Sequence, residues 1–169
     1  MSIFIPNEYH KSIHDIDLVK LYESGKRLIL TDLDNTLVSY VEPLPTEDIR
    51  LFKQKCDEIG LTLVIISNNN EKRVKHFADE LGVTYLAKAL KPFRRAYRML
   101  TMDYRPDEVV IIGDQILTDI VGGNRMGFYT ILVDAIDYNT ESWKTKFNRF
   151  FERIIIKKFK IKGDKHGRT

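Results

Sequence analysis

The sequence predicts an α/β fold in which helices cover both faces of a parallel sheet, giving a three-layer, doubly wound architecture. Two observations carry this prediction. Segments 61–66 and 109–112 are almost continuously apolar, as in parallel strands that are buried on both faces. Segments with apolar residues at helical spacing lie between such strands, which is the alternation expected of a parallel sheet. The length of 169 residues is enough for one domain.

The first predicted elements are a helix and a strand. Residues 12–24 place apolar side chains at helical spacing, and Gly25 is suited to end a helix. The apolar segment 27–32 then predicts the first strand. A loop with two prolines follows and leads to a helix that Thr46 caps and Gly60 ends.

The rest of the chain continues the alternation of strands and helices. Segment 61–66 predicts the second strand, and Asn70 is suited to cap the helix after it. The later predicted elements are the end of that helix at Gly82, a short strand near 83–86, a helix from Pro92, a strand over 109–112, a helix near 117–125 and a strand at 129–133.

Two aspartates, Asp32 and Asp34, follow the end of the first predicted strand. Side chains alternate along a strand with period two, so both would project to the same side. Two carboxylates beside a buried strand are unfavourable without a cation or a chemical role. One could act as a nucleophile and the other as an acid or base, with a divalent metal offsetting their repulsion. The alternative is a strand end closed by an Asx-turn.

Polar residues also follow the ends of other predicted strands. These are Ser67, Lys91 and Asp114. Ligands of parallel sheets bind outside the carboxyl ends of the strands. We therefore expect segments that are far apart in the sequence to form one site at this edge of the sheet.

These segments resemble the haloacid dehalogenase-like (HAD) phosphohydrolase superfamily. Within it, the chain is similar to the subclass IIIA, YqeG-like group, relatives of mitochondrial phosphatidylglycerophosphate phosphatase. The resemblance implies a HAD-like Rossmannoid fold and hydrolysis of phosphate esters. The residues that carry it are Asp32-Leu33-Asp34-Asn35-Thr36, Ser67-Asn68-Asn69-Asn70-Glu71, Lys91-Pro92, and Gly113-Asp114-Gln115 with Thr118-Asp119.

The resemblance assigns three catalytic residues. Asp32 is expected to attack phosphorus and form an aspartyl-phosphate. Asp34 is expected to protonate the leaving oxygen and then deprotonate the hydrolytic water. Lys91 is expected to neutralise charge on the nucleophile and the phosphoryl group. Lys88 is an alternative, but only Lys91 precedes a proline as the family lysine does.

The resemblance also implies a magnesium ion. Asp32 and Asp114 would supply side-chain oxygens, and Asp34 would supply its backbone carbonyl. Oxygen ligands of this kind suit a hard cation such as Mg²⁺. Asp119 would act through water or orient another ligand, and the alternative for it is an acid that stabilises the start of a helix.

Four further residues are candidates for binding the substrate. Ser67 is expected to bind a phosphate oxygen, although a capping serine is the alternative, and Asn68 could add a donor. Arg94 and Arg95 could contact a large anionic substrate, or they could form a solvated helix face. The intervals from Asp34 to Ser67 and from there to the lysine leave no room for a cap domain. An open site suits a lipid head group, a nucleic-acid end or a protein.

The positive charge of the chain is concentrated at its C-terminal end. Residues 142–169 contain ten Lys or Arg and two acids, a balance of +8 in a chain of net charge +3. We expect a phosphatase domain over 1–140, a basic amphipathic helix over 141–162 and a disordered tail over 163–169. Such a helix suits an anionic bilayer, and the alternatives are packing on the domain or binding RNA.

Composition and the start of the chain limit the other possibilities. We see neither a secretory signal nor an apolar stretch long enough to span a bilayer. The lone Cys56 excludes an intrachain disulfide and is expected to be a small buried residue. We expect a cytoplasmic Mg²⁺-dependent phosphomonoesterase, peripheral on the inner face of the membrane, acting on phosphatidylglycerophosphate. The alternatives are a phosphatase of a soluble ester and a weakly catalytic RNA- or ribosome-associated binding module.

Overall fold

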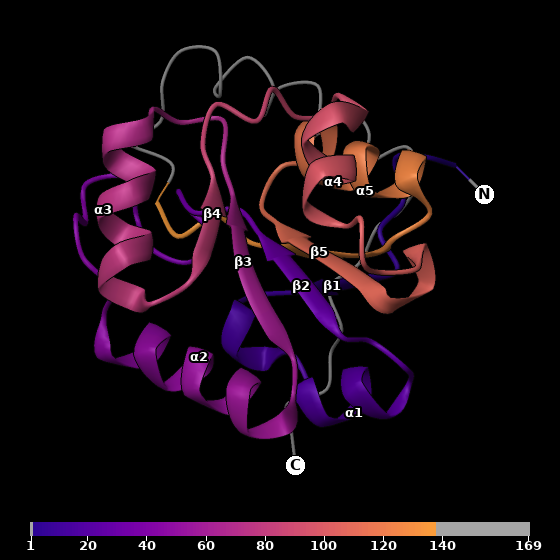
Figure 1. Ribbon diagram of the computed structural model, residues 1–169, viewed down its shortest axis with the longest axis horizontal. Coiled ribbons are helices and arrows are strands. Elements are labelled where there is room, and N and C mark those ends of the chain that lie inside the picture. Colours follow the sequence, from indigo (N-terminus) through magenta and orange to yellow (C-terminus); the bar gives the residue numbers. More distant parts are fainter. Residues whose placement is uncertain (1, 138–169) are drawn as a thin grey trace.

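The computed structural model describes residues 2–137, in which six parallel strands form one sheet in the order β1-β6-β5-β2-β3-β4 (Figure 1). The predicted α/β fold is therefore confirmed. The regions 141–162 and 163–169, for which a basic helix and a disordered tail are predicted, lie outside the described residues. The strands are β1 (Glu8–His10), β2 (Leu28–Thr31), β3 (Thr62–Ile66), β4 (Thr84–Leu86), β5 (Val109–Gly113) and β6 (Tyr129–Val133).

Helices cover both faces of the sheet, so the predicted three layers are present (Figure 1). Alternate residues of each strand contribute to opposite cores, as the period of two requires. In β2, Ile29 faces the core formed with the first three helices, whereas Leu28 and Leu30 face the core formed with the last two. The helices are α1 (Leu18–Glu23), α2 (Glu47–Ile59), α3 (Glu71–Leu81), α4 (Arg94–Leu100) and α5 (Val121–Met126).

The capping residues expected from the sequence end α2 and α3. Gly60 and Gly82 follow these helices with φ of +93° and +72°, a left-handed conformation that glycine adopts without steric cost. The Asn70 side chain accepts a hydrogen bond from the backbone N–H of Arg73 at 2.9 Å and so caps α3. Thr46 precedes α2 but makes no side-chain capping bond.

The N-terminal region differs from the prediction in two ways. The single helix expected over 12–24 is wrong: a 3₁₀ turn at Ile13–Asp15 precedes α1. The side chain of Asp17 accepts from the Lys20 N–H at 3.0 Å and starts a new helix there. In addition, the sequence analysis missed β1, which pairs with β6 at one edge of the sheet. The three residues of β1, which include a glutamate and a histidine, produce no apolar pattern that would reveal a strand.

Two helix starts also differ from the expected positions. Helix α4 begins at Arg94 rather than at Pro92, because the Phe93 N–H still bonds to the Leu90 carbonyl in a turn at 3.0 Å. The segment predicted as a helix near 117–125 divides into a π-helical turn, Ile116–Ile120, and α5. Both differences lie beside the carboxyl edge of the sheet.

The topology brings the four polar segments to that edge. Strands β5, β2, β3 and β4 are neighbours in the sheet, so the residues after them lie side by side. Between β2 and α2 the described chain forms a loop with one isolated bridge, Asp34 to Val38, and no inserted domain. None of the helices between residues 2 and 137 has the length and apolar character needed to cross a bilayer.

Candidate active site

Asp32 and Lys91 form the centre of the candidate site. Asp32 follows β2, and its backbone N–H continues the strand pairing by donating to the Ile112 carbonyl at 2.9 Å. Lys91 comes from the loop between β4 and α4. Its ammonium Nζ lies 2.8 Å from Oδ1 of Asp32, and only 2% of the Lys91 side chain is exposed. A buried ion pair of this geometry joins two segments 59 residues apart.

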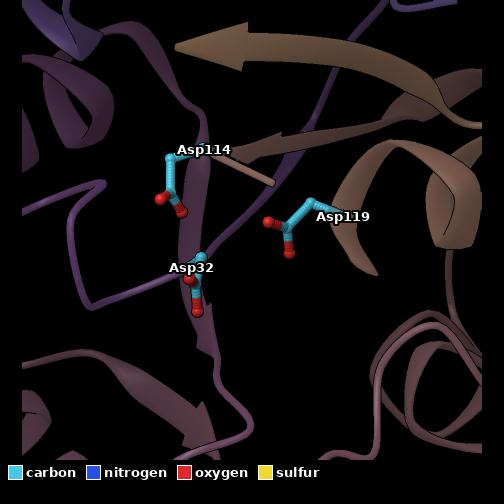
Figure 2. A group of neighbouring side chains, drawn as sticks. All are labelled: Asp32, Asp114 and Asp119. Atoms are coloured by element: carbon cyan, nitrogen blue, oxygen red, sulfur yellow. The ribbon is translucent and has the colours of Figure 1, made fainter. Parts of the chain in front are cut away.

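Three buried carboxylates gather around this pair (Figure 2). Oxygen atoms of Asp32, Asp114 and Asp119 all lie within 4.8 Å of one another. Figure 2 shows the carboxylates of Asp114 and Asp119 directed toward the space beside Asp32. The hydroxyl of Thr36 donates to Oδ1 of Asp114 at 3.1 Å and orients it. The carboxylates come from the ends of β2 and β5 and from the π-helical turn.

Lys91 forms ion pairs with two of these carboxylates. Its Nζ also lies 2.7 Å from Oδ1 of Asp119, which is completely buried. Burial opposes the charge of Lys91, but the carboxylates of Asp119 and Asp32 outweigh it and raise the pKa of Lys91 well above its ordinary value. Burial raises the pKa of Asp119 to about 6, although Lys91 acts in the opposite direction. One ammonium thus faces more negative charge than it can compensate.

Gly113 permits this arrangement by its lack of a side chain. A Cβ atom at Gly113 would lie 2.3 Å from Cγ of Asp119, far inside van der Waals contact. The backbone N–H of Gln115 donates to Oδ2 of Asp119 at 3.2 Å and holds the carboxylate from the other side. The glycine before Asp114 is therefore required for the position of Asp119.

The backbone around Lys91 is fixed by Asn68. The Asn68 side chain accepts from the Lys91 N–H at 2.7 Å and donates to the Lys91 carbonyl at 3.2 Å. The Lys91–Pro92 peptide bond is cis. The neighbouring Ser67 is buried, and its hydroxyl accepts from the Asn69 N–H at 3.1 Å. The structure therefore places Asn68 against the lysine loop and Ser67 at the end of β3.

Asp34 lies beside the carboxylate cluster and has partners of its own. Arg73 of α3 contacts Oδ1 of Asp34 through both Nε, at 3.1 Å, and Nη2, at 2.9 Å. Asn69 donates from its side-chain nitrogen to Oδ2 at 2.8 Å. Burial raises the pKa of Asp34, and the nearby Asp32 adds to the rise, while Asn69 and Arg73 act against it. The Asp34 side chain is not part of the three-carboxylate cluster.

Sequence reasoning missed two of these contacts. Asn69 belongs to the quoted segment after β3, so its polarity was a usable signal. Arg73 had none, because one basic residue in the first turn of a helix is usually solvated. The four remaining candidates divide by burial: Ser67 is buried, whereas Asn68, Arg94 and Arg95 are exposed.

The donor set fits a hard divalent cation. Three buried carboxylates with one ammonium leave excess negative charge, which is unfavourable unless a cation or protons offset it. Oxygen atoms are the ligands that Mg²⁺ prefers. The residues that could hold such an ion are Asp32, Asp114 and Asp119. A carboxylate beside a buried ammonium, within a cluster that could hold a cation, is an arrangement suited to phosphoryl transfer.

The chain is similar to curated proteins over nearly all its length. A Bacillus subtilis (strain 168) protein named probable phosphatase YqeG is 41% identical over 162 residues, covering 95% of this chain and 94% of the relative. Phosphatidylglycerophosphate phosphatase 1, chloroplastic/mitochondrial, of Arabidopsis thaliana is 24% identical over 170 residues. That match covers 94% of this chain and 49% of the plant protein, so the chain spans about half of its length.

A family model and a solved structure also match the chain. The family model described as HAD-hyrolase-like matches residues 89–147. The crystal structure of 3-deoxy-D-manno-octulosonate 8-phosphate phosphatase from Moraxella catarrhalis, in complex with magnesium ion, phosphate ion and KDO, matches with a TM-score of 0.52. It is 18% identical, and the match covers 83% of this chain and 92% of that chain. At this identity the similarity concerns the fold.

Proposed function

Because this chain belongs to the HAD-like hydrolase family, as a YqeG-like phosphatase, we propose that it hydrolyses phosphatidylglycerophosphate through an aspartyl-phosphate on Asp32. The observation that carries the proposed chemistry is the buried contact of Lys91 with Asp32 at 2.8 Å. An ammonium held against a carboxylate at the end of a strand fixes the position of that carboxylate at the open edge of the sheet.

In the first half of the proposed reaction, a carboxylate oxygen of Asp32 attacks phosphorus. The bond between phosphorus and the ester oxygen breaks, and Asp34 gives its proton to the departing oxygen. Lys91 stays protonated throughout, because its raised pKa lies far above neutral pH. Its charge offsets the negative charge that moves onto the phosphoryl oxygens.

In the second half, a water molecule attacks the phosphorus of the aspartyl-phosphate. Asp34 accepts a proton from this water, the bond from phosphorus to Asp32 breaks, and inorganic phosphate leaves. The raised pKa of Asp34 supports the first role, since a carboxyl group that holds its proton more tightly is a better acid near neutral pH. The carboxyl group is ionised again when the water must be deprotonated.

The cation proposed for the site is Mg²⁺, held by Asp32, Asp114 and Asp119, with the backbone carbonyl of Asp34 as a further ligand. When bound, it supplies positive charge to the phosphoryl oxygens and offsets the repulsion of the carboxylates. Asp119 has a second task in this proposal, because its contact with Lys91 at 2.7 Å orients the ammonium.

The proposed phosphate site also uses residues after β3 and in α4. The hydroxyl of Ser67 is proposed to donate to a phosphate oxygen. Asn68 is proposed to act mainly by positioning the Lys91 backbone, given its two hydrogen bonds there. Arg94 and Arg95 are exposed and are proposed to contact the anionic remainder of a large substrate.

Three features support a lipid substrate over a small soluble ester. The Arabidopsis relative is named for phosphatidylglycerophosphate and aligns with 94% of this chain. The described segments between Asp34 and Lys91 contain no inserted domain that could enclose a small metabolite. The sequence of residues 142–169 is strongly basic, which favours an anionic surface.

The test is a phosphate-release assay on phosphatidylglycerophosphate in mixed micelles, beside soluble phosphomonoesters, with and without Mg²⁺. Asp32→Asn should abolish turnover, while Asp103→Asn, an exposed aspartate outside the site, should leave it unchanged. Asp34→Asn should also lose most turnover, because asparagine can neither protonate the departing oxygen nor deprotonate the water. Hydroxylamine should trap the aspartyl-phosphate of the wild type during turnover as an acyl hydroxamate, and Asp32→Asn should give none. A soluble ester preferred by orders of magnitude would contradict the lipid substrate. Turnover by Asp32→Asn at the wild-type rate would contradict the mechanism.

A further inference from the structure

The loop that carries Lys91 exposes large apolar side chains on either side of it. Leu90 is 68% exposed and Phe93 is 66% exposed, although the Lys91 side chain between them is buried. Half-exposed apolar residues are common on protein surfaces, but two side chains of this size and exposure beside a catalytic group are not explained by packing.

The backbone of this loop supports the idea that the exposure has a function. Lys88 and Leu90 have φ of +48° and +55°, in the left-handed region that residues with large side chains rarely adopt. The Lys88 N–H donates to the Asn69 carbonyl at 3.0 Å, and Asn68 holds the loop farther on. The surrounding structure thus maintains an unfavourable conformation that keeps Leu90 outward, and such conformations persist mainly at functional sites.

A second loop, after β2, exposes apolar side chains at the same edge of the sheet. Val41 is 67% exposed and Leu44 is 41% exposed. Arg73 fixes this loop, because its guanidinium donates to the carbonyls of Ser39, at 3.3 Å, and Glu42, at 2.5 Å. The same guanidinium forms an ion pair with the carboxylate of Asp34, the proposed acid, so Arg73 contacts both this loop and the proposed active site.

Exposed basic side chains accompany the exposed apolar ones. Lys88, Arg94 and Arg95 are exposed, and none of them forms an ion pair with another residue between positions 2 and 137. Apolar side chains that can enter the head-group boundary, next to cations that attract acidic lipids, are the combination that binds an anionic bilayer.

We infer that the loop 39–44 and the segment 88–95, which is the lysine loop with the start of α4, dock the open site on an anionic lipid bilayer, with Leu90 and Phe93 in the interfacial region. This inference rests on the proposed function, because docking would bring the phosphate monoester of a lipid close to Lys91 and Asp32. Lys88 lies in the same loop, and Arg94 and Arg95 begin α4 directly after it. All three would contact lipid phosphates while the apolar pair is inserted.

The test measures binding of the full chain to vesicles, independently of catalysis. Vesicles of equal parts phosphatidylglycerol and phosphatidylcholine are compared with phosphatidylcholine alone in co-sedimentation at low and high salt. Leu90→Ser/Phe93→Ser should weaken binding to the anionic vesicles at least about tenfold. The matched control is Val19→Ser/Met102→Ser, which removes two apolar side chains of 53% and 82% exposure away from this edge and should bind as the wild type does.

Two further variants measure separately the contributions of the basic side chains and of the loop 39–44 to vesicle binding. Arg94→Gln/Arg95→Gln should reduce binding to anionic vesicles only, and high salt should remove most of its difference from the wild type. Val41→Ser/Leu44→Ser on the other loop should weaken binding several-fold. Equal circular dichroism and thermal midpoints for the variants and the control exclude a folding defect as the cause.

The outcomes distinguish this inference from the proposed function. Wild-type binding by Leu90→Ser/Phe93→Ser, or equal binding to both vesicle types, overturns the inference and leaves the phosphatase proposal standing. If Leu90→Ser/Phe93→Ser weakens binding to RNA but leaves binding to vesicles unchanged, the inference is also overturned. Vesicle binding that depends on these loops, without turnover of phosphatidylglycerophosphate, would instead contradict the proposed substrate.

Discussion

The completely buried Asp119 should make a contribution to the stability of the metal-free protein that falls as the pH rises from mild acid to neutral. Its pKa rises from the ordinary 3.8 to about 6 in the folded state, mainly because burial disfavours the charge. Between about pH 4 and pH 6 the folded protein therefore binds more protons at this residue than the unfolded chain does. The stabilisation from the protonated form is present below pH 4 and is lost as the pH rises through about 6.

The magnitude follows from the size of the pKa rise. Each pKa unit corresponds to about 1.4 kcal/mol, so Asp119 should lower the free energy of unfolding by about 3 kcal/mol across this interval. Other carboxylates with paired ionised forms change stability in the opposite direction. The difference between wild type and Asp119→Asn isolates the residue, because the asparagine cannot titrate.

The assay is urea unfolding, followed by circular dichroism in the presence of EDTA, at several pH values from 4 to 7. The stability of wild type relative to Asp119→Asn should fall by about 3 kcal/mol as the pH rises. Asp103→Asn serves as the control for the removal of an exposed aspartate. Added Mg²⁺ should raise the wild-type stability at pH 7, because binding to the folded state alone stabilises it. Parallel pH profiles for wild type and Asp119→Asn would refute the reasoning.

Three other predictions concern single residues, two of them in the site and one in the core. Gly113→Ala should lower the free energy of unfolding by about 1–3 kcal/mol and reduce turnover, because the new Cβ would lie 2.3 Å from Cγ of Asp119. Urea unfolding measures the stability and phosphate release measures the turnover. Unchanged turnover would contradict the steric argument. Arg73→Gln should reduce kcat about tenfold by releasing Asp34, and Arg73→Lys should restore little, because lysine cannot make the two contacts to the carboxylate. Cys56 should resist alkylation at pH 8 in the native protein and react on unfolding, since burial raises its thiol pKa to about 12; equal labelling rates in both states would be inconsistent with that pKa.

Much of the fold could be predicted because its signals are local. Continuous apolar segments identified the strands that are buried on both faces, and β3 and β5 begin and end within a residue of the expected positions. Gly60 and Gly82 end their helices as expected, and Asn70 begins one. The cysteine at position 56 is completely buried, as expected of a small apolar residue on a helix face.

The failures share a physical cause, which is that tertiary contacts override weak local preferences. Strand β1 exists because β6 offers it a partner, and its own side chains carry no strand pattern. The helix expected over 12–24 is interrupted because Asp17 caps a new turn. Val19, one of the apolar residues in that segment, is 53% exposed, since the interruption changes which residues face the sheet.

The amino-acid sequence alone determined which side chains lie at the ends of the parallel strands. The reason is that the period of a strand and the continuity of its apolar residues depend only on residues close together in the chain. That was enough to indicate Asp32, Asp34, Lys91 and Asp114 as residues of one edge. Only the folded structure decided their partnerships: the sharing of Lys91 between two carboxylates and the contact of Asp34 with Arg73. Such contacts join segments dozens of residues apart, and their geometry depends on the packing of every element between them.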